Sequence, residues 1–201
     1  MSASIAIVRY NAGNIQSLLF ALSRLGVEPV VTDDVEALRH ADKVIFPGVG
    51  EARSAMTYLR ARGLDAVIRG LRQPVLGICI GMQLLCAYSE ENDTECMGVF
   101  SPVLRKFVAR DDFPQRIKIP HIGWNTINFE PHPLFSGVSS GSFVYYVHSY
   151  AAEIAPETIA STEYGASFSG AVHKDNFYAV QFHPEKSGEI GSRILRNFLD
   201  L

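Results

Sequence analysis

The sequence predicts an α/β fold with a central, mostly parallel, twisted sheet flanked by helices and a β-rich, partly antiparallel C-terminal half. In the first half of the chain, short apolar runs alternate with amphipathic helical segments, which is typical of a parallel sheet covered on both faces. After Gly98, strand-like segments follow one another with only short turns between them, which favours antiparallel pairing. We expect all 201 residues to form one domain.

The strands expected in the first half are apolar runs bounded by glycine or proline. Their length and apolar content are typical of buried strands. They are SIAIVRY at 4–10, EPVVT at 28–32, KVIFPG at 43–48 and QPVLGIC at 73–79.

Helices are expected between these strands. Residues 14–27 carry leucines at helical spacing, with Gly26 where the helix would end. Asp33 or Asp34 is expected to cap a short helix that runs through Leu38. Residues 51–72 should supply one or two further helices before the strand that leads to Cys79.

The second half contains strand-like segments and one final helix. The apolar residues of 187–201 recur at helical spacing, so this segment is expected to close the domain as an amphipathic helix. The expected strands are VFSPVLRKF at 99–107, RIKIP at 116–120, NTINFE at 125–130, SFVYYVHSY at 142–150, TIASTEY at 158–164, FSGAVHK at 168–174 and FYAVQFH at 177–183.

Composition excludes several classes of partner. The 18 basic and 21 acidic residues give a net charge of -3 without a long run of either sign, so neither nucleic acid nor a membrane is expected as a partner. No apolar run approaches the roughly 18 residues of a membrane span, and the N-terminus does not resemble a secretory leader; we expect a cytoplasmic protein. Cys79, Cys86 and Cys96 do not cluster with histidines, so free thiols are expected, with no metal and no cofactor.

The segment GICIG at 77–81 has the form of a nucleophile elbow in which cysteine replaces serine. A thiol on such a turn stands at a helix N-terminus, which favours the thiolate, and the amide of Ile80 could donate to an oxyanion. The alternative is that Cys79 is only a small buried apolar residue between turn-forming glycines. Gln83 follows one helical turn later on the same face and could bind a substrate over the sulfur, or it could be a solvated helix residue. Cys86 is expected in the core, and Cys96 in a loop or at the surface.

A histidine is needed to act with a cysteine nucleophile, and His183 is the best of the six candidates. An apolar strand is expected to run directly into it, and Glu185 follows two residues later. If the segment through Pro184 is extended, alternation points both side chains to one side. A carboxylate beside the imidazole would hold the ring and stabilise its charged form. His148 ends another expected strand and could line a pocket; a surface or structural role is expected for the other histidines.

The glycine loop PGVGEA at 47–52 lacks the spacing of a phosphate-binding loop. It follows a strand of the same sheet, so its backbone amides should lie near the Cys79 turn. The loop is therefore a candidate for the second half of an oxyanion hole.

With PGVGE, GICIGMQLL and HPEKS in this order, the chain resembles the class I (triad) glutamine amidotransferases over essentially its whole length. The resemblance implies a flavodoxin-like sheet and a Cys79, His183, Glu185 triad. It also implies an oxyanion hole that involves the peptide of Gly48, Val49 and Gly50. Within the family, IPHIGWN at 119–125, FVYYVHSY at 143–150 and the lysine after the glutamate resemble the glutaminase subunits of bacterial imidazole glycerol phosphate synthase, an enzyme of histidine biosynthesis.

This resemblance also implies a substrate, a partner and their contacts. Glutamine would be hydrolysed to glutamate and ammonia, and the ammonia passed to a separate (β/α)8-barrel cyclase subunit in a heterodimer. The substrate would be held by Gly50, Gln83 and the backbone of His148, Ser149 and Tyr150. The barrel would be contacted by Trp124, Tyr145 and Lys186. The segment RYNAGN at 9–14 departs from the family pattern, so interface details are not transferred to it.

Three other interpretations share parts of the pattern. The glutaminase subunit that feeds pyridoxal phosphate synthesis has a similar elbow and His/Glu pair, although PHIGWN and GVGEA favour the histidine pathway. A peptidase-like or chaperone-like hydrolase would act without a partner and would not need Gln83. In a non-enzymatic regulatory module, Cys79, His183 and Glu185 would have no catalytic role.

Overall fold

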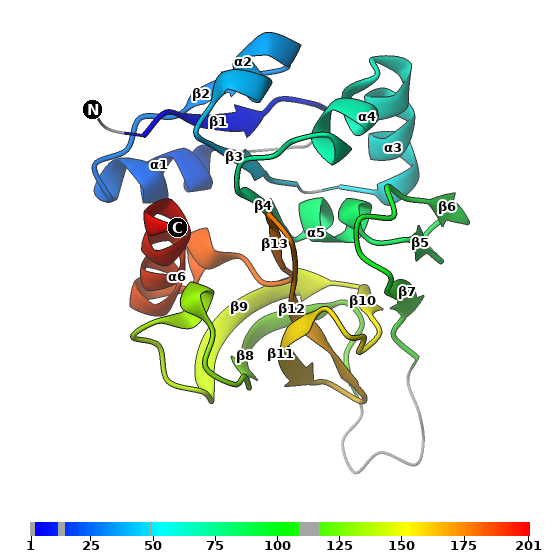
Figure 1. Ribbon diagram of the computed structural model, residues 1–201. Coiled ribbons are helices and arrows are strands. Elements are labelled where there is room, and N and C mark those ends of the chain that lie inside the picture. The colour runs from blue at the N-terminus through cyan, green and yellow to red at the C-terminus, as the bar shows by residue number, and fades with distance from the viewer. Residues whose placement is uncertain (1–2, 12–14, 49, 109–116) are drawn as a thin grey trace.

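The structure is a computed structural model that describes residues 3–11, 15–48, 50–108 and 117–201 (Figure 1). Its centre is a seven-stranded sheet in the order β11-β12-β13-β4-β3-β1-β2. The five strands from β13 to β2 run parallel, and β11 and β12 add antiparallel pairs at one edge. The strands are β1 (Ile5–Val8), β2 (Val30–Thr32), β3 (Lys43–Phe46), β4 (Val75–Ile78), β11 (Thr158–Glu163), β12 (Ser167–Lys174) and β13 (Phe177–Val180).

Two smaller sheets accompany the central one. A four-stranded sheet has the order β10-β7-β5-β6, and β8 pairs with β9 in an antiparallel ribbon. In this ribbon Trp124 lies opposite Tyr145. The strands are β5 (Tyr88–Ser89), β6 (Thr94–Glu95), β7 (Val103–Lys106), β8 (His121–Ile127), β9 (Ser142–His148) and β10 (Tyr150–Ala152).

The helices begin and end where local signals predict. Asp34 caps its helix by accepting a hydrogen bond from the Ala37 N–H at 2.8 Å. The 51–72 segment forms two helices because Gly63, at φ 67°, takes a left-handed conformation between them. The helices are α1 (Gln16–Arg24), α2 (Val35–His40), α3 (Ala52–Ala61), α4 (Leu64–Arg69), α5 (Ile80–Leu85) and α6 (Gly188–Asp200), with 3₁₀ turns η1 (Pro133–Phe135) and η2 (Pro184–Lys186).

Each face of the parallel strands has its own apolar core. Alternate residues such as Ile7 and Ile45 pack with the residues of α1 and α6 on one face. Their neighbours Val44 and Phe46 pack with the residues of α2, α3 and α4 on the other. This arrangement explains why the first-half strands are almost entirely apolar, and it leaves the carboxyl ends of β3, β4 and β13 together at one edge.

The structure corrects several of the sequence predictions. The strand expected at 142–150 ends at His148, and Tyr150 begins β10 in a different sheet. Residues 117–120 of RIKIP form no strand, and Arg116 lies outside the described residues. The strand expected at 125–130 begins earlier, at His121, because it pairs along the whole of β9. The strand expected at 177–183 ends at Val180, and the chain then leaves the sheet. Of the two remaining cysteines, Cys96 follows β6 in a loop as expected and is buried there, and Cys86 is in the core as expected.

The strands β5 and β6 were not predicted at all, because each pairs through only two residues. Among the described residues, no helix is long and apolar enough to span a membrane. The same part of the chain contains no group of three or more metal-ligating side chains.

Candidate active site

Cys79 stands between β4 and α5 in a strained conformation. Its φ of 53° and ψ of -109° lie outside the regions that a side chain with a Cβ ordinarily adopts, at a cost of about 1–3 kcal/mol. The flanking glycines are required by packing: a Cβ on Gly81 would lie 1.9 Å from the Phe46 carbonyl oxygen, and one on Gly77 would lie 2.9 Å from Leu85 Cδ1. The apolar run, the sharp turn and the helix thus form the elbow that the sequence predicts.

His183 and Glu185 meet as expected, but through a different backbone. The segment after His183 is the 3₁₀ turn η2 rather than an extended chain, so the predicted alternation was wrong. The turn folds Glu185 back beneath the ring, and the His183 Nδ1–H donates to Glu185 Oε1 at 2.7 Å. The Ser187 hydroxyl fixes the turn by donating to the His183 carbonyl oxygen at 2.6 Å. Both side chains are nearly buried, at 2% and 9% exposed.

The environment of His183 favours the charged imidazolium. Burial alone would lower the pKa of this ring, but interactions with Cys79 and Glu185 outweigh burial and raise the pKa of His183 to about 10. The Nε2 atom is buried and has no hydrogen-bond partner, so it does not complete a hydrogen bond to the sulfur although the two groups interact electrostatically. At neutral pH the ring is therefore protonated at Nε2, and no protein group accepts a hydrogen bond from this N–H.

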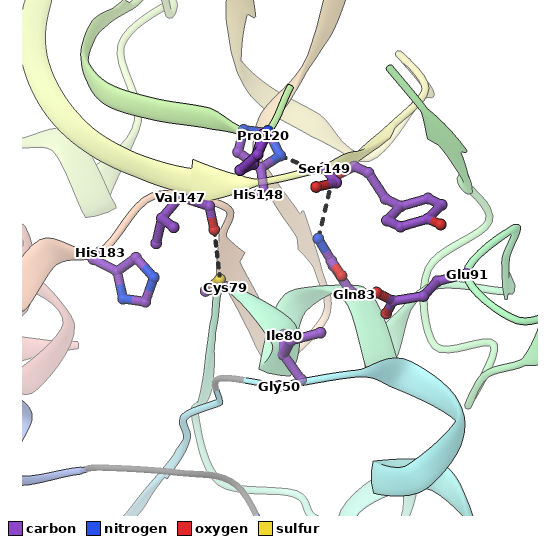
Figure 2. A pocket seen from close by; sticks show the side chains of 11 residues that line it. Gly50, Cys79, Ile80, Gln83, Glu91, Pro120, Val147, His148, Ser149 and His183 are labelled. Carbon is purple, nitrogen blue, oxygen red and sulfur yellow. Dashed lines mark hydrogen bonds between the residues drawn. The ribbon is translucent and has the colours of Figure 1, made fainter. Parts of the chain in front are cut away.

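A cavity of about 310 Å³ joins these groups. It lies between the Cys79 elbow on one side and the ends of β9 and β10 on the other (Figure 2). Its lining brings together almost all the predicted catalytic, oxyanion and substrate residues: Cys79, His183, Ile80, Gly50, Gln83, His148, Ser149 and Tyr150. Glu185 does not line the cavity but is hydrogen-bonded to His183, which does.

The predicted oxyanion loop lies beside the elbow. Gly48 packs closely against two side chains: a Cβ there would lie 2.3 Å from the Tyr10 hydroxyl and 2.8 Å from Ile80 Cγ2. The Tyr10 hydroxyl donates to the Pro47 carbonyl at 2.6 Å and holds the start of the loop. Gly50 has a φ of 121°. Val49, the third predicted member, lies outside the described residues, as do residues 12–14 of the divergent 9–14 segment.

Gln83 is a buried hydrogen-bonded residue and not a solvated one. Its Nε2 group donates to the Tyr150 carbonyl at 3.2 Å and to Gln181 Oε1 at 3.0 Å. Because a carbonyl oxygen can only accept, Tyr150 fixes which end of the Gln83 amide faces it. The Gln83 Oε1 atom is left on the cavity side, next to Glu91 (Figure 2).

A second chain of hydrogen bonds ends on the same carbonyl. The His148 Nδ1–H donates to the Tyr150 carbonyl oxygen at 2.8 Å. In the neutral ring His148 Nε2 is then an acceptor, and the His121 Nδ1–H donates to it at 3.0 Å. Burial lowers the pKa of His148 to about 3 and the pKa of His121 to about 4. Both rings are therefore neutral at pH 7 and held by aromatic side chains, including Phe107.

Sequence reasoning missed three residues of this region. Glu91 lines the cavity, and its Oε2 accepts from the Ala52 N–H at 2.8 Å. It is brought there by the two-residue strands β5 and β6, which leave no periodic signal in the sequence. Gln181 and His121 lie beneath the cavity wall. The sequence VQFHP contains a polar residue inside an apolar run, and that was the available signal for Gln181.

Two of the residues predicted to contact a partner, Trp124 and Tyr145, lie on the outer face of the β8–β9 ribbon, and Lys186 lies beside them in η2. Ile122, Trp124 and Phe143 are 59%, 55% and 59% exposed, an unusual group of large apolar side chains on one surface. The Trp124 and Tyr145 rings meet edge to face at 5.9 Å, and Lys186 Nζ lies 6.0 Å from the Tyr145 ring centre. The ribbon's inner end supplies Val147 and His148 to the cavity, so this face borders the site.

Comparison with known proteins agrees with this geometry. The family model described as glutamine amidotransferase class-I matches residues 7–201. The chain is 55% identical over 197 residues to the imidazole glycerol phosphate synthase subunit HisH of Bacteroides fragilis, covering 98% of this chain and 99% of that protein. The protein of the same name from Colwellia psychrerythraea is 44% identical, covering 100% of this chain and 94% of that one.

Solved structures with little sequence identity share the fold. A putative GMP synthase protein from Thermoplasma acidophilum superposes with a TM-score of 0.75 at 21% identity, covering 100% of this chain and 94% of that one. PurLQS from Thermotoga maritima gives a TM-score of 0.72 at 18% identity, covering 100% and 99%. The α/β architecture, the elbow and the extent of the family match lead to one conclusion: the chain belongs to the class I glutamine amidotransferases.

Proposed function

We propose that this protein is the glutaminase subunit of an imidazole glycerol phosphate synthase. It hydrolyses L-glutamine to glutamate and ammonia through a thioester on Cys79, and it passes the ammonia to a separate (β/α)8-barrel cyclase subunit in histidine biosynthesis. One observation carries the proposal: a strained cysteine and a buried His183, hydrogen-bonded to Glu185, line one cavity in a chain that is 41% to 55% identical to HisH proteins. This identity also favours the histidine pathway over the pyridoxal phosphate pathway.

The cavity has groups that suit an α-amino acid. Glu91 offers a carboxylate to the α-ammonium, and burial raises the pKa of this carboxyl as expected for a site that a cation completes. Gln83 Oε1 is a second acceptor beside it. The backbone of Ser149 and Tyr150 and the Gly50 amide provide the remaining polar contacts. A volume of about 310 Å³ accommodates a ligand of the size of glutamine.

The first half of the reaction forms the thioester. The Cys79 thiolate attacks the side-chain amide carbon, and the carbonyl oxygen takes up the electron pair. The Ile80 N–H belongs to the first turn of α5, so it has no partner within the helix and is free to donate to this oxyanion, together with the peptide around Gly48–Gly50. His183 Nε2 gives its proton to the departing nitrogen, and ammonia leaves.

The second half restores the enzyme. His183, now neutral, accepts a proton from water, and the resulting hydroxide attacks the thioester carbon. The sulfur leaves as thiolate beside the re-formed imidazolium, which regenerates the initial charge pair. Glu185 holds the ring in the same tautomer throughout, because its oxygen accepts from Nδ1 and leaves Nε2 for the reacting atoms.

A partner follows from the product. Ammonia released into neutral water becomes ammonium, which is no nucleophile, so it must reach its acceptor through a protected path. The exposed face of Ile122, Trp124 and Phe143 borders the cavity and is the surface we assign to the cyclase, with Tyr145 and Lys186 at its edge. Because glutamine hydrolysis without an acceptor is wasteful, the peptide around Gly48–Gly50 is the candidate switch that the partner sets.

The test is glutaminase turnover of the wild type and of Cys79→Ala, each with and without the cognate cyclase and its nucleotide ligand. We expect Cys79→Ala to lose at least about 10⁴-fold in turnover. The wild type without the cyclase should be slower by roughly a hundredfold, the worth of a missing oxyanion donor. Cys96→Ala removes a second buried thiol away from the cavity and is the control. Turnover that survives in Cys79→Ala would eliminate the nucleophile, and full activity of the isolated chain would eliminate the switch.

A further inference from the structure

Gln181 is a fully buried polar side chain directly beside the nucleophile. It follows β13, in which Val180 pairs in parallel register with Ile78, the residue before Cys79. The Cys79 N–H donates to the Val180 carbonyl at 2.8 Å, which keeps the two chains in step past the end of the sheet. Gln181 Nε2 then lies 3.8 Å from Cys79 Sγ, within the range of an N–H···S hydrogen bond.

The orientation of the Gln181 amide follows from its neighbours. Tyr150 O can only accept, so it draws the Nε2 group of Gln83, and that same group also donates to Gln181 Oε1. With its oxygen engaged in this way, Gln181 must turn its own N–H groups toward the sulfur. The series Tyr150, Gln83, Gln181 and Cys79 therefore has a single direction, set by one backbone carbonyl that His148 also contacts.

The sulfur has two polar contacts with opposite preferences. Val147 O lies 3.9 Å from Sγ and can only accept, so it favours the protonated thiol. Gln181 Nε2 can only donate, so it favours the ionised sulfur. Without Gln181, the sulfur would keep the Val147 carbonyl as an acceptor, and only the charge of His183 would favour the thiolate.

We propose that Gln181 is a further catalytic residue: its amide N–H donates to Cys79 Sγ, stabilises the thiolate, and is held in that orientation by Gln83 and the Tyr150 carbonyl. The inference rests on the proposed function for its place in catalysis. The contact assists twice, because charge resides on the sulfur before attack on the amide and returns to it when the thioester breaks. Gln83 thereby has two tasks, one toward the substrate and one toward the nucleophile.

Alkylation of the isolated chain by iodoacetamide, followed across the pH range, tests this without glutamine or a partner. Only the thiolate reacts, so the midpoint of the rate profile reports the ionisation of the sulfur. We expect Gln181→Met, which keeps the volume and removes the donor, to move the midpoint upward by about one pH unit, a tenfold loss of thiolate at neutral pH. Gln181→Glu should move it further, because a carboxylate then faces the sulfur. A purely structural role predicts no such order.

The chain offers controls for the measurement. Cys79→Ala shows which thiol is alkylated; burial raises the pKa of Cys96 to about 12 and also raises that of Cys86, so both should react slowly. Gln73→Met is the matched control, since the Gln73 amide donates at 2.7 Å to Leu38 O, a backbone carbonyl away from the cavity. The other titratable groups near the sulfur are His183, His148 and Glu91, which line the cavity, and Tyr10, and each is unchanged in every variant.

If Gln181→Met does not fold, Gln83→Met carries the test. It frees the Gln181 amide to rotate, and we expect a smaller upward shift of the midpoint. A folded Gln181→Met protein, or failing that Gln83→Met, with the wild-type midpoint would overturn the proposal. Absence of ammonia release from glutamine in the complex would instead refute the proposed function, whatever the alkylation profile shows.

Discussion

The two walls of the Cys79 cavity hold buried histidines in different charge states: His183 is positively charged at neutral pH, and His148 is neutral. On the η2 side, burial is outweighed by interactions with Cys79 and Glu185, and the pKa of His183 is about 10. On the β9 side, burial dominates, and the pKa of His148 is about 3. His183 donates to a carboxylate, whereas His148 donates to the Tyr150 carbonyl and accepts from His121. Both rings are almost fully buried, so burial alone does not decide the charge.

The difference teaches that each wall has its own task. The first wall, formed by the Cys79 elbow and η2, contains the proton on His183 Nε2 and the strained backbone of Cys79, and both take part in the reaction. The second wall is neutral, aromatic and fully hydrogen-bonded, which suits a surface that positions Tyr150 and Gln83 against the substrate without exchanging protons. The two roles differ because His183 donates to a carboxylate and His148 to a backbone carbonyl. Changing the acceptor of a ring therefore tests the comparison.

Glu185→Gln is the change with the largest expected effect, because it gives the first wall a neutral partner like that of the second. We expect the pKa of His183 to fall and kcat to drop by about 10³–10⁴-fold, as when a triad carboxylate becomes an amide. Turnover in the cyclase complex measures the loss, and NMR titration of the ring measures the charge. Near-normal turnover with a neutral His183 would show that the carboxylate is not needed.

Gly81→Ala tests whether the strained elbow tolerates movement. The added Cβ would lie 1.9 Å from the Phe46 carbonyl oxygen, so either β3 or the elbow must shift. We expect a loss of about 3 kcal/mol in the free energy of unfolding, from urea titration. Gly70→Ala is the matched control, since its Cβ would be 3.3 Å from the Ala66 carbonyl oxygen. Equal stability of the two variants would contradict the tight packing of the elbow.

The first wall was largely predictable from its own residues. The second was predicted only in part, because the substrate role of His148, Ser149 and Tyr150 came from the family resemblance, and Glu91 and His121 were missed. GICIG and His183-Pro184-Glu185 are local patterns whose chemistry requires those residues, although the backbone between His183 and Glu185 is a 3₁₀ turn and not a strand. Glu91 reaches the cavity from the turn between β5 and β6, which have two residues each, and His121 meets His148 through their register in the β8–β9 ribbon. Such placements depend on long-range pairing, which leaves no periodicity of its own in the chain.

The pH dependence of stability provides the smallest but most selective test of the comparison. The folded-state pKa of His121, about 4, lies below the ordinary value of 6.5, so the unfolded chain binds more protons between these values and stability falls as pH falls through them. His183 has the opposite sign: its raised pKa contributes stability that is present below about 6.5 and lost as pH rises toward about 10. In a plot of stability against pH, we therefore assign the fall on the acid side (the acid limb) to His121 in the second wall. We assign the fall on the alkaline side (the alkaline limb) to His183 in the first.

His121→Gln keeps a donor for His148 and removes one group that must stay neutral. We expect it to reduce the acid-induced loss of stability by about 2 kcal/mol near a pH of about 4.5, with the alkaline limb unchanged. Urea midpoints over a pH series measure both limbs, and His40→Gln, whose side chain is 77% exposed in the wild type, controls for the loss of a histidine as such. An acid limb as steep as that of the wild type would mean that protonation of another group unfolds the protein. The neutral pair of the second wall would then have no special place in its stability.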